Sequence, residues 1–362
     1  MDGSRALPGE GAATAEGAAW GMQRRTLTVA DVLAALDRLT RGRLLPFGPD
    51  PAAAGRHPYV IWKSSGIPGK EVLETPGLVV GSPDQPVRRV AMGITLTESV
   101  IELAGATGVD LLISHHPVAD AASSGGVPLA RYLGLYGLAL IELHEAFHGL
   151  HPGIPFLHGL RPMHYEVGFG GIPGHVVVVG EPLAEIRCLG DIVRRLDSWM
   201  GLDREVAALA REREAAGSDG VQSATVATRS RILLGRPEDE VTGIIQIFPH
   251  SGTEPEHLHA LADRFAFCNT VVASISRVVA GSPLVKAAAR RGLHFVLGNS
   301  HPFEVFENWL PLAQALERLL PELEIVIWQQ PVFTVPLQAA GSPELRAYAE
   351  QMAAYLLGCS RE

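Results

Sequence analysis

A short apolar run that ends in two adjacent histidines constrains this chain more than any other feature. Val109–Ile113 is followed by Ser114, His115, His116 and Pro117, which is the pattern of a buried strand that ends at a proline. In an open α/β sheet, binding and reacting groups lie at the carboxyl ends of the strands. Neutral imidazole has a free lone pair and is the commonest side-chain metal ligand near neutral pH. The run therefore indicates a candidate metal site, although two adjacent histidines alone fit solvated or core positions equally well.

Histidines recur after two other strand-like stretches. One cluster contains His144, His148 and His151, and the other contains His301 with Glu304. The i,i+4 spacing in the first cluster and the i,i+3 spacing in the second place side chains on one face of a helical turn. Three strand ends that carry histidine, two of them with carboxylates nearby, predict that these clusters converge on one metal centre.

The remaining histidines are weaker candidates. His250 lies with Ser251 and Thr253 in a polar loop after the predicted strand Val241–Phe248, where it could line the same cleft. The others are interpreted as structural or exposed residues: His57, His158, His164, His175, His257, His259 and His294.

Helix and strand patterns alternate along the chain, which predicts an α/β protein. Val87–Ile94 and the run before His115 have strand patterns, and Thr97–Ala106 between them has a helix pattern. Such a βαβ unit predicts a parallel strand pair with a right-handed crossover. A second alternating series follows, and its strand at His294–Leu297 leads to His301. We therefore expect two related αβ domains with mixed sheets and the metal site in the cleft between them.

The same patterns suggest domain boundaries. Residues 1–24 are rich in Ala and Gly without the apolar segment of a signal peptide, so we expect a disordered leader. Residues 25–165 form the expected first αβ domain with the His-His motif, and residues 166–229 form a helical or linker segment. Residues 230–362 form the expected second αβ domain with the His/Glu motif.

Composition excludes several classes of function. A formal net charge of −9 argues against nucleic acid as the main partner. No apolar stretch reaches the roughly 18 residues that a membrane span requires. Cys188, Cys268 and Cys359 are far apart and odd in number, so they predict neither a disulfide framework nor a zinc finger. We expect a cytoplasmic protein whose metal site uses histidine and carboxylate.

Three stretches resemble the NIF-three-like family, whose members are also known as GTP cyclohydrolase 1 type 2 homologues. The stretches are Glu74–Ser82, Val90–Thr95 and Gly108–Pro117, and the element from Gly298 to His301 is similar to a glycine-to-histidine element near the family's C-terminus. The resemblance implies a protein with a dinuclear centre of divalent metal ions. It also implies assembly into a homo-hexameric ring.

Carried over by position, the resemblance implies three pairs of metal ligands: His115 and His116, His144 and His148, and His301 and Glu304. The chain departs from the family pattern at three places. His148 replaces an aspartate, Glu304 follows His301 after three residues instead of four, and a further histidine pair is absent at Ser274–Arg277. The centre could therefore differ in metal identity, or hold one ion rather than two.

Histidine ligands with few carboxylates suit zinc, iron, manganese or nickel better than magnesium or calcium. Two such ions roughly 3.5–4 Å apart can lower the pKa of a bridging water and clamp an oxyanion. That chemistry predicts hydrolysis of an amide, cyclic amidine or phosphoester in a small-molecule substrate. Glu145, next to His144, is the candidate general base or a substitute ligand. The alternative is a non-catalytic metal-binding scaffold or a partner-binding regulatory protein.

Overall fold

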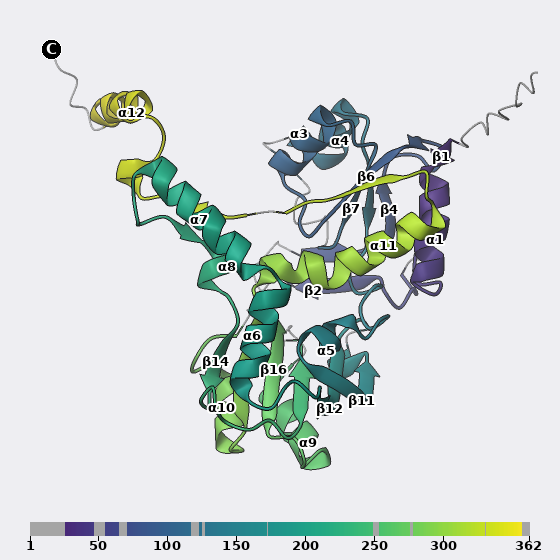
Figure 1. Ribbon diagram of the computed structural model, residues 1–362. Coiled ribbons are helices and arrows are strands. Elements are labelled where there is room, and N and C mark those ends of the chain that lie inside the picture. Colours follow the sequence, from purple (N-terminus) through teal and green to yellow (C-terminus); the bar gives the residue numbers. More distant parts are fainter. Residues whose placement is uncertain are drawn as a thin grey trace, which may run out of the picture.

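The structure is a computed structural model that describes residues 26–46, 55–64, 71–116, 123–124, 127–171, 173–248, 253–275, 278–329 and 331–356. The expected disordered leader, residues 1–24, lies outside the described residues, as do His250 and Ser251. Two larger mixed sheets, one of five strands and one of six, form the body of the protein (Figure 1). This arrangement confirms the predicted α/β class.

The five-stranded sheet has the order β18-β6-β7-β10-β4. Its strands are β4 (Gly77–Val80), β6 (Arg89–Gly93), β7 (Leu111–Ser114), β10 (Ala139–Glu142) and β18 (Glu324–Ile327). β18, β6, β7 and β10 are parallel, and β4 is antiparallel to β10. The parallel strand pair predicted on either side of the helix at Thr97–Ala106 is confirmed, because β6 and β7 are parallel neighbours.

Helices cover both faces of this sheet. Side chains alternate along β7, so Leu111 and Ile113 pack with α1 (Val29–Leu39) and α11 (Leu310–Leu319). Leu112 points to the other face and packs with α3 (Glu98–Ala106) and α4 (Leu129–Leu135). A strand that is buried on both faces reads as a continuous apolar run, which explains the pattern before His115.

The six-stranded sheet has the order β11-β12-β15-β16-β17-β14. Its strands are β11 (Leu160–Val167), β12 (Val176–Pro182), β14 (Arg231–Leu234), β15 (Ile244–Ile247), β16 (Thr270–Ile275) and β17 (His294–Asn299). β15, β16 and β17 are parallel, and the other pairs are antiparallel. One face packs against α9 (Pro255–Arg264) and α10 (Pro283–Arg290), and the other against α6 (Leu189–Trp199).

The chain returns from the second sheet to the first through two short helices. After β17 come the 3-10 helix η3 (His301–Phe303) and the π-helix η4 (Val305–Trp309), which continues into α11. Trp309 is fully buried in the core of the first sheet. This return carries the last histidine cluster from one sheet to the other.

The smaller elements connect these layers. Two-stranded pairs are formed by β1 (Leu27–Thr28) with β5 (Pro86–Val87), β2 (Ile61–Ser64) with β3 (Glu71–Glu74), β8 (Ser123–Ser124) with β9 (Val127–Pro128), and β13 (Gln222–Ser223) with β19 (Phe333–Thr334). The short helices are α5 (Gly153–Leu157), η2 (Phe169–Gly171), α8 (Ala224–Ala227) and η5 (Leu337–Ala339). The longer α7 (Leu202–Ala216) and α12 (Pro343–Leu356) project away from both sheets (Figure 1).

Two strands lie where the sequence analysis did not place them. β12 falls inside the segment expected to be helical or linker, yet it pairs with β11 and β15 in the second sheet. β18 falls inside the expected second domain but pairs with β6 in the first sheet. The domain boundaries themselves stay a prediction. Within the described ranges, none of the helices combines the length and the apolar character required to cross a membrane.

Candidate metal centre

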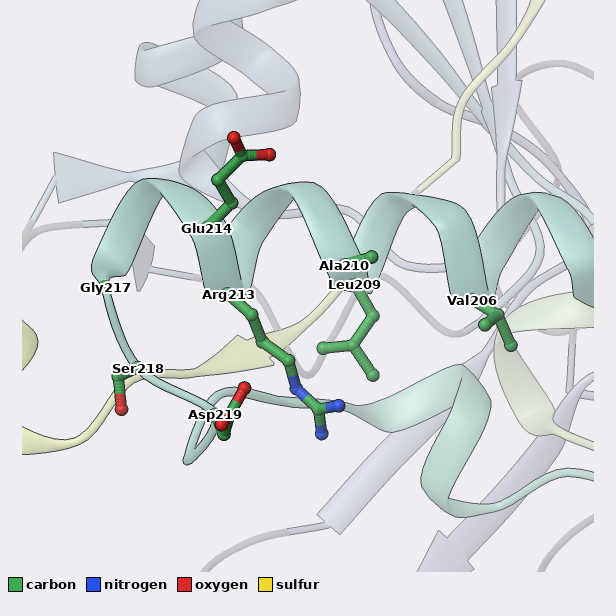
Figure 2. Close-up of a pocket in the computed structure, with 8 residues that line it drawn as sticks. All are labelled: Val206, Leu209, Ala210, Arg213, Glu214, Gly217, Ser218 and Asp219. Atoms are coloured by element: carbon green, nitrogen blue, oxygen red, sulfur yellow. The ribbon is translucent and has the colours of Figure 1, made fainter.

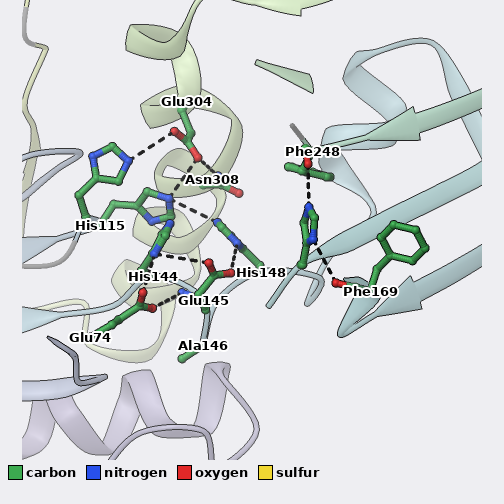
Figure 3. A network of polar contacts seen from close by, with 12 residues as sticks. Glu74, His115, His144, Glu145, Ala146, His148, Phe169, Phe248, Glu304 and Asn308 are labelled. Carbon is green, nitrogen blue, oxygen red and sulfur yellow. Dashed lines mark hydrogen bonds and ion pairs between the residues drawn. The ribbon is translucent and has the colours of Figure 1, made fainter. Parts of the chain in front are cut away.

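The three predicted clusters come together between the two sheets (Figure 3). The end of β7 supplies His115 and His116, and the turns after β10 supply His144 and His148. His301 lies in the 3-10 helix η3 and Glu304 directly follows it. Because side chains at i and i+3 eclipse in a 3-10 helix, these last two groups point the same way. The predicted convergence is confirmed in its geometry.

The first group of candidate ligand atoms is formed by His115, His144 and His148. These atoms all lie within 4.8 Å of one another, and all three residues are buried. His148 Nε2 is 3.4 Å from His115 Nε2. Two nitrogen ligands on one tetrahedral ion are separated by roughly 3.3 Å when each bond is about 2.0–2.1 Å long. The spacing of the two rings therefore fits a shared divalent ion.

The second group is formed by His115, His116 and Glu304, again with ligand atoms within 4.8 Å of one another. His301 adjoins it, because its Nε2 is 3.3 Å from His116 Nε2 and 3.1 Å from Glu304 Oε2. The rings of His116 and His301 are stacked with centroids 4.9 Å apart. This spacing also fits two nitrogens on one ion, with the carboxylate as a third ligand.

Buried carboxylates orient the histidines of the first group. Glu74 Oε2 is 3.0 Å from His144 Nδ1, and Glu74 Oε1 accepts a hydrogen bond from the backbone N–H of Glu145 (Figure 3). Glu145 Oε2 is 3.0 Å from His148 Nδ1. A carboxylate on one ring nitrogen leaves the other nitrogen available to a metal. Glu74, His144 and Glu145 also form a third candidate group of ligand atoms.

A hydroxyl orients the second group in the same manner. Thr95 follows β6, and its Oγ1 is 2.8 Å from His116 Nδ1. Sequence analysis missed both Thr95 and Glu74 as site residues. The register of the parallel strands could have identified Thr95, because Gly93 lies opposite Ser114 and so brings Thr95 beside His116.

Burial keeps two of the imidazoles neutral. Desolvation lowers the pKa of His115 to about 4. Desolvation, together with the neighbouring His115, lowers the pKa of His116 to about 2. Burial alone would raise the pKa of Glu304, but His115 and His301 outweigh it and hold that pKa well below its usual value. Neutral imidazoles beside an ionised carboxylate are the protonation states that metal binding requires.

The centre is closed on one side and open on the other. The side chains of His115, His148 and Glu304 are 0%, 3% and 4% exposed. His116 and His301 are 16% and 31% exposed. A cavity of about 510 Å³ begins at His301 and Thr95. The stacked pair is therefore the accessible edge of the centre.

A second cavity, of about 490 Å³, follows α7 and the turn at Gly217–Asp219 (Figure 2). Its lining mixes apolar side chains with Arg213, Glu214 and Asp219. Arg213 Nε donates to the carbonyl of Val221, so this side chain is engaged in holding the turn. No residue of the histidine clusters lines this cavity, and we do not place the function there.

Other sequence candidates lie outside the cluster. His151 accepts a hydrogen bond from the backbone N–H of Gly153 and belongs to none of the ligand groups among the described residues. Thr253 Oγ1 is 3.0 Å from His175 Nε2, and neither residue belongs to a ligand group among the described residues. His158 and His175 are fully buried and lie against backbone carbonyls, in agreement with the structural role expected for them.

Glu307 is a buried carboxyl group that the centre does not use. Asn299 Nδ2 donates to its Oε1, while Oε2 has no hydrogen-bond partner within the described structure. Burial, reinforced by the nearby Glu304, raises the pKa of Glu307 to about 8 despite the bond from Asn299. The folded protein therefore retains a proton on this group up to about pH 8, whereas the unfolded chain loses it near its ordinary value of 4.5.

We expect Glu307→Gln to remove part of the pH dependence of folding. Because the folded pKa is raised, the wild-type free energy of unfolding should fall as pH rises from about 4.5 to 8, by at most about 1.4 kcal/mol per pH unit. The variant cannot ionise and should lack that component in urea unfolding at pH 5.5, 7 and 8.5. Parallel pH profiles for the two proteins would contradict the buried neutral acid.

Comparison with known proteins gives a family match over part of the chain and a shared fold. Residues 65–122 match the family described as Duf34/NIF3 (NGG1p interacting factor 3). The structure is similar to reduced HcgD from Methanocaldococcus jannaschii, with a TM-score of 0.53 and 13% identity, over 84% of this chain and 98% of that chain. It is also similar to the hypothetical protein SA1388 from Staphylococcus aureus, with a TM-score of 0.50 and 15% identity, over 84% and 97%. No curated protein matches the chain. At these identities the two structures support a shared fold, and the expected homo-hexamer stays a prediction.

Proposed function

From the match of residues 65–122 to the Duf34/NIF3 family, we propose that the chain is a member of that family and a metal-dependent hydrolase that acts on a small molecule. The observation that carries the proposal is the asymmetry of the centre. Its inner ligand group is buried, while His301 at the outer edge lines a cavity. A structural metal site is closed by protein ligands, whereas a catalytic site keeps a position open.

The residues divide between holding and orienting. His115, His144 and His148 would hold an inner ion, and His116, His301 and Glu304 an outer one. A divalent ion bound at the outer position supplies a water of lowered pKa and a charge that stabilises an oxyanion. The donor set favours zinc, iron, manganese or nickel. Because His115 belongs to two ligand groups, we leave the stoichiometry at one or two ions per chain.

Two roles are proposed for Glu145: to position His148 and to act as a general base. Its contact with His148 Nδ1 supports a positioning role, since it fixes which nitrogen of that ring faces the centre. The general-base role comes from the sequence alone. Glu145 is buried and does not line the cavity at His301, where a substrate would enter. Thr95 performs the equivalent positioning for His116.

The proposal is tested by asking whether bound metal keeps a position open to water. We expect metal analysis of the purified protein to give one or two divalent ions per chain. After exchange with Mn²⁺, the water-proton relaxation rate should rise well above that of a chelated manganese control without exchangeable water. His301→Ala should lose the outer ion and most of this enhancement, because it removes the accessible ligand.

Two results would contradict the hydrolase. A protein purified and reconstituted without bound metal would remove the chemistry altogether. Bound manganese without exchangeable water would mean a saturated site, and the centre would then be a scaffold that holds the fold together.

A further inference from the structure

The cavity at the accessible edge lies between two segments that follow strands of the first sheet. One wall is the start of α3, with Thr97, Ser99, Val100 and Leu103. The facing wall is the segment after β18, with Trp328, Gln329, Pro331 and Val332. Its volume of about 510 Å³ lies within the range of small-molecule sites.

The lining carries no fixed positive charge. Among the described residues that line the cavity, none is Lys or Arg, and His301 is the only titratable side chain. Phosphate groups are recognised by Arg, Lys or the free N–H groups of a helix N-terminus. Here the Thr97 hydroxyl accepts from the backbone N–H of Val100, and Glu98 places a carboxylate in the first turn of α3. This helix start is therefore unfavourable for a phosphate.

The lining is instead suited to an apolar body with a few polar atoms. Leu103 and Val332 are 49% and 58% exposed at the cavity, although both side chains are apolar. The side chains of Ser99 and Gln329 form no hydrogen bond within the described part of the chain, so they can pair with ligand atoms. Apolar walls with a few polar groups are typical of small-molecule sites, and the absence of Lys and Arg from the described lining favours an uncharged ligand.

We propose that this cavity binds the apolar, ring-sized body of an uncharged amide, with its scissile C–N group at His301, the ligand that lines the cavity. The inference rests on the proposed hydrolase and narrows its substrate class to amides, because the described cavity walls offer a phosphate neither Lys nor Arg nor a free helix N-terminus. In hydrolysis of the amide, the water oxygen bonds to the carbonyl carbon and the C–N bond breaks. One water proton goes to the leaving nitrogen, which gives a carboxylic acid and an amine.

A matched pair of variants tests the cavity by itself. Leu103→Trp fills the cavity, whereas Leu135→Trp makes the same change at a leucine of α4 that is 74% exposed and lines no part of the cavity. The probes are quinolin-2-one, a neutral bicyclic lactam, and guanosine 5′-monophosphate, each titrated by calorimetry into the metal-loaded protein. We expect Leu103→Trp to weaken lactam binding at least tenfold and Leu135→Trp to leave it unchanged. Any binding of the nucleotide should be the same in Leu103→Trp as in the wild type.

The proposal is overturned if the lactam does not bind, if the two variants bind it equally well, or if Leu103→Trp abolishes binding of the nucleotide. Metal content is measured on every sample, which separates this result from the hydrolase itself. A protein that binds the lactam as expected but holds no metal supports the ligand class of the cavity and contradicts the hydrolase. A protein that holds metal with exchangeable water but ignores the lactam contradicts the ligand class alone.

Discussion

Replacing His115 by glutamine is expected to abolish tight metal binding at the whole centre, with affinity for zinc falling by more than roughly 100-fold. Loss of an outer-shell partner alone typically costs about 10- to 100-fold, and His115 is itself a candidate ligand. It belongs to two of the three ligand groups, and its Nε2 faces both His148 Nε2 and Glu304 Oε1. Competition with a chromophoric chelator measures the affinity.

His158→Gln is the matched control, because His158 is equally buried but lies against backbone carbonyls outside the ligand groups. It should lower stability yet keep the metal affinity of the wild type. Zinc at 1,000 times its dissociation constant should raise the free energy of unfolding of the wild type by about 4 kcal/mol. The same zinc concentration should stabilise His158→Gln similarly and His115→Gln hardly at all. Equal metal content in His115→Gln and the wild type would exclude His115 as a ligand.

The parts of the site that follow strand ends could be predicted from the sequence. His115 and His301 each come after an apolar run, and site residues lie at the carboxyl ends of parallel strands, here of one strand in each sheet. The i,i+3 spacing of His301 and Glu304 predicted that their side chains point the same way, and the 3-10 helix places them so. These arguments need only local patterns and one rule about sheets.

Glu74 could not be found in this way. It precedes the turn into β4, and it meets His144 across 70 residues of chain. Nothing local distinguishes an acidic residue that is fully buried from one that is exposed, and only the folded structure shows that Glu74 is buried. Its role depends on the antiparallel pairing of β4 with β10, which brings this segment to the turns that carry His144.

The fold shows the same division between local and long-range information. β7 and α3 were predicted because periodicity is local, and in the structure Thr97 caps α3. β12 was missed, although Val176–Val179 is a fully buried apolar run of the kind that predicts a strand. β18 lies in the expected second domain but pairs in the first sheet, because a short apolar run does not specify its partner. The return through η4 and α11 decides that pairing.

Gly298→Ala is expected to destabilise the protein by about 3 kcal/mol and to weaken the outer metal position with it. A Cβ at Gly298 would lie 2.4 Å from the Ala273 carbonyl oxygen and 2.7 Å from that of Ser274. Both are backbone atoms of β16, so β17 must shift away, and β17 leads directly to His301.

Gly134→Ala is the matched control, because a Cβ there meets no atom within 4 Å and Gly134 lies in α4. That change should be neutral or stabilise the helix by roughly 0.5–1 kcal/mol. Chemical unfolding of both variants gives the stabilities, and zinc titration gives the affinities. If Gly298→Ala were as stable as Gly134→Ala and bound zinc as the wild type does, the close approach of β16 and β17 would not be what positions His301.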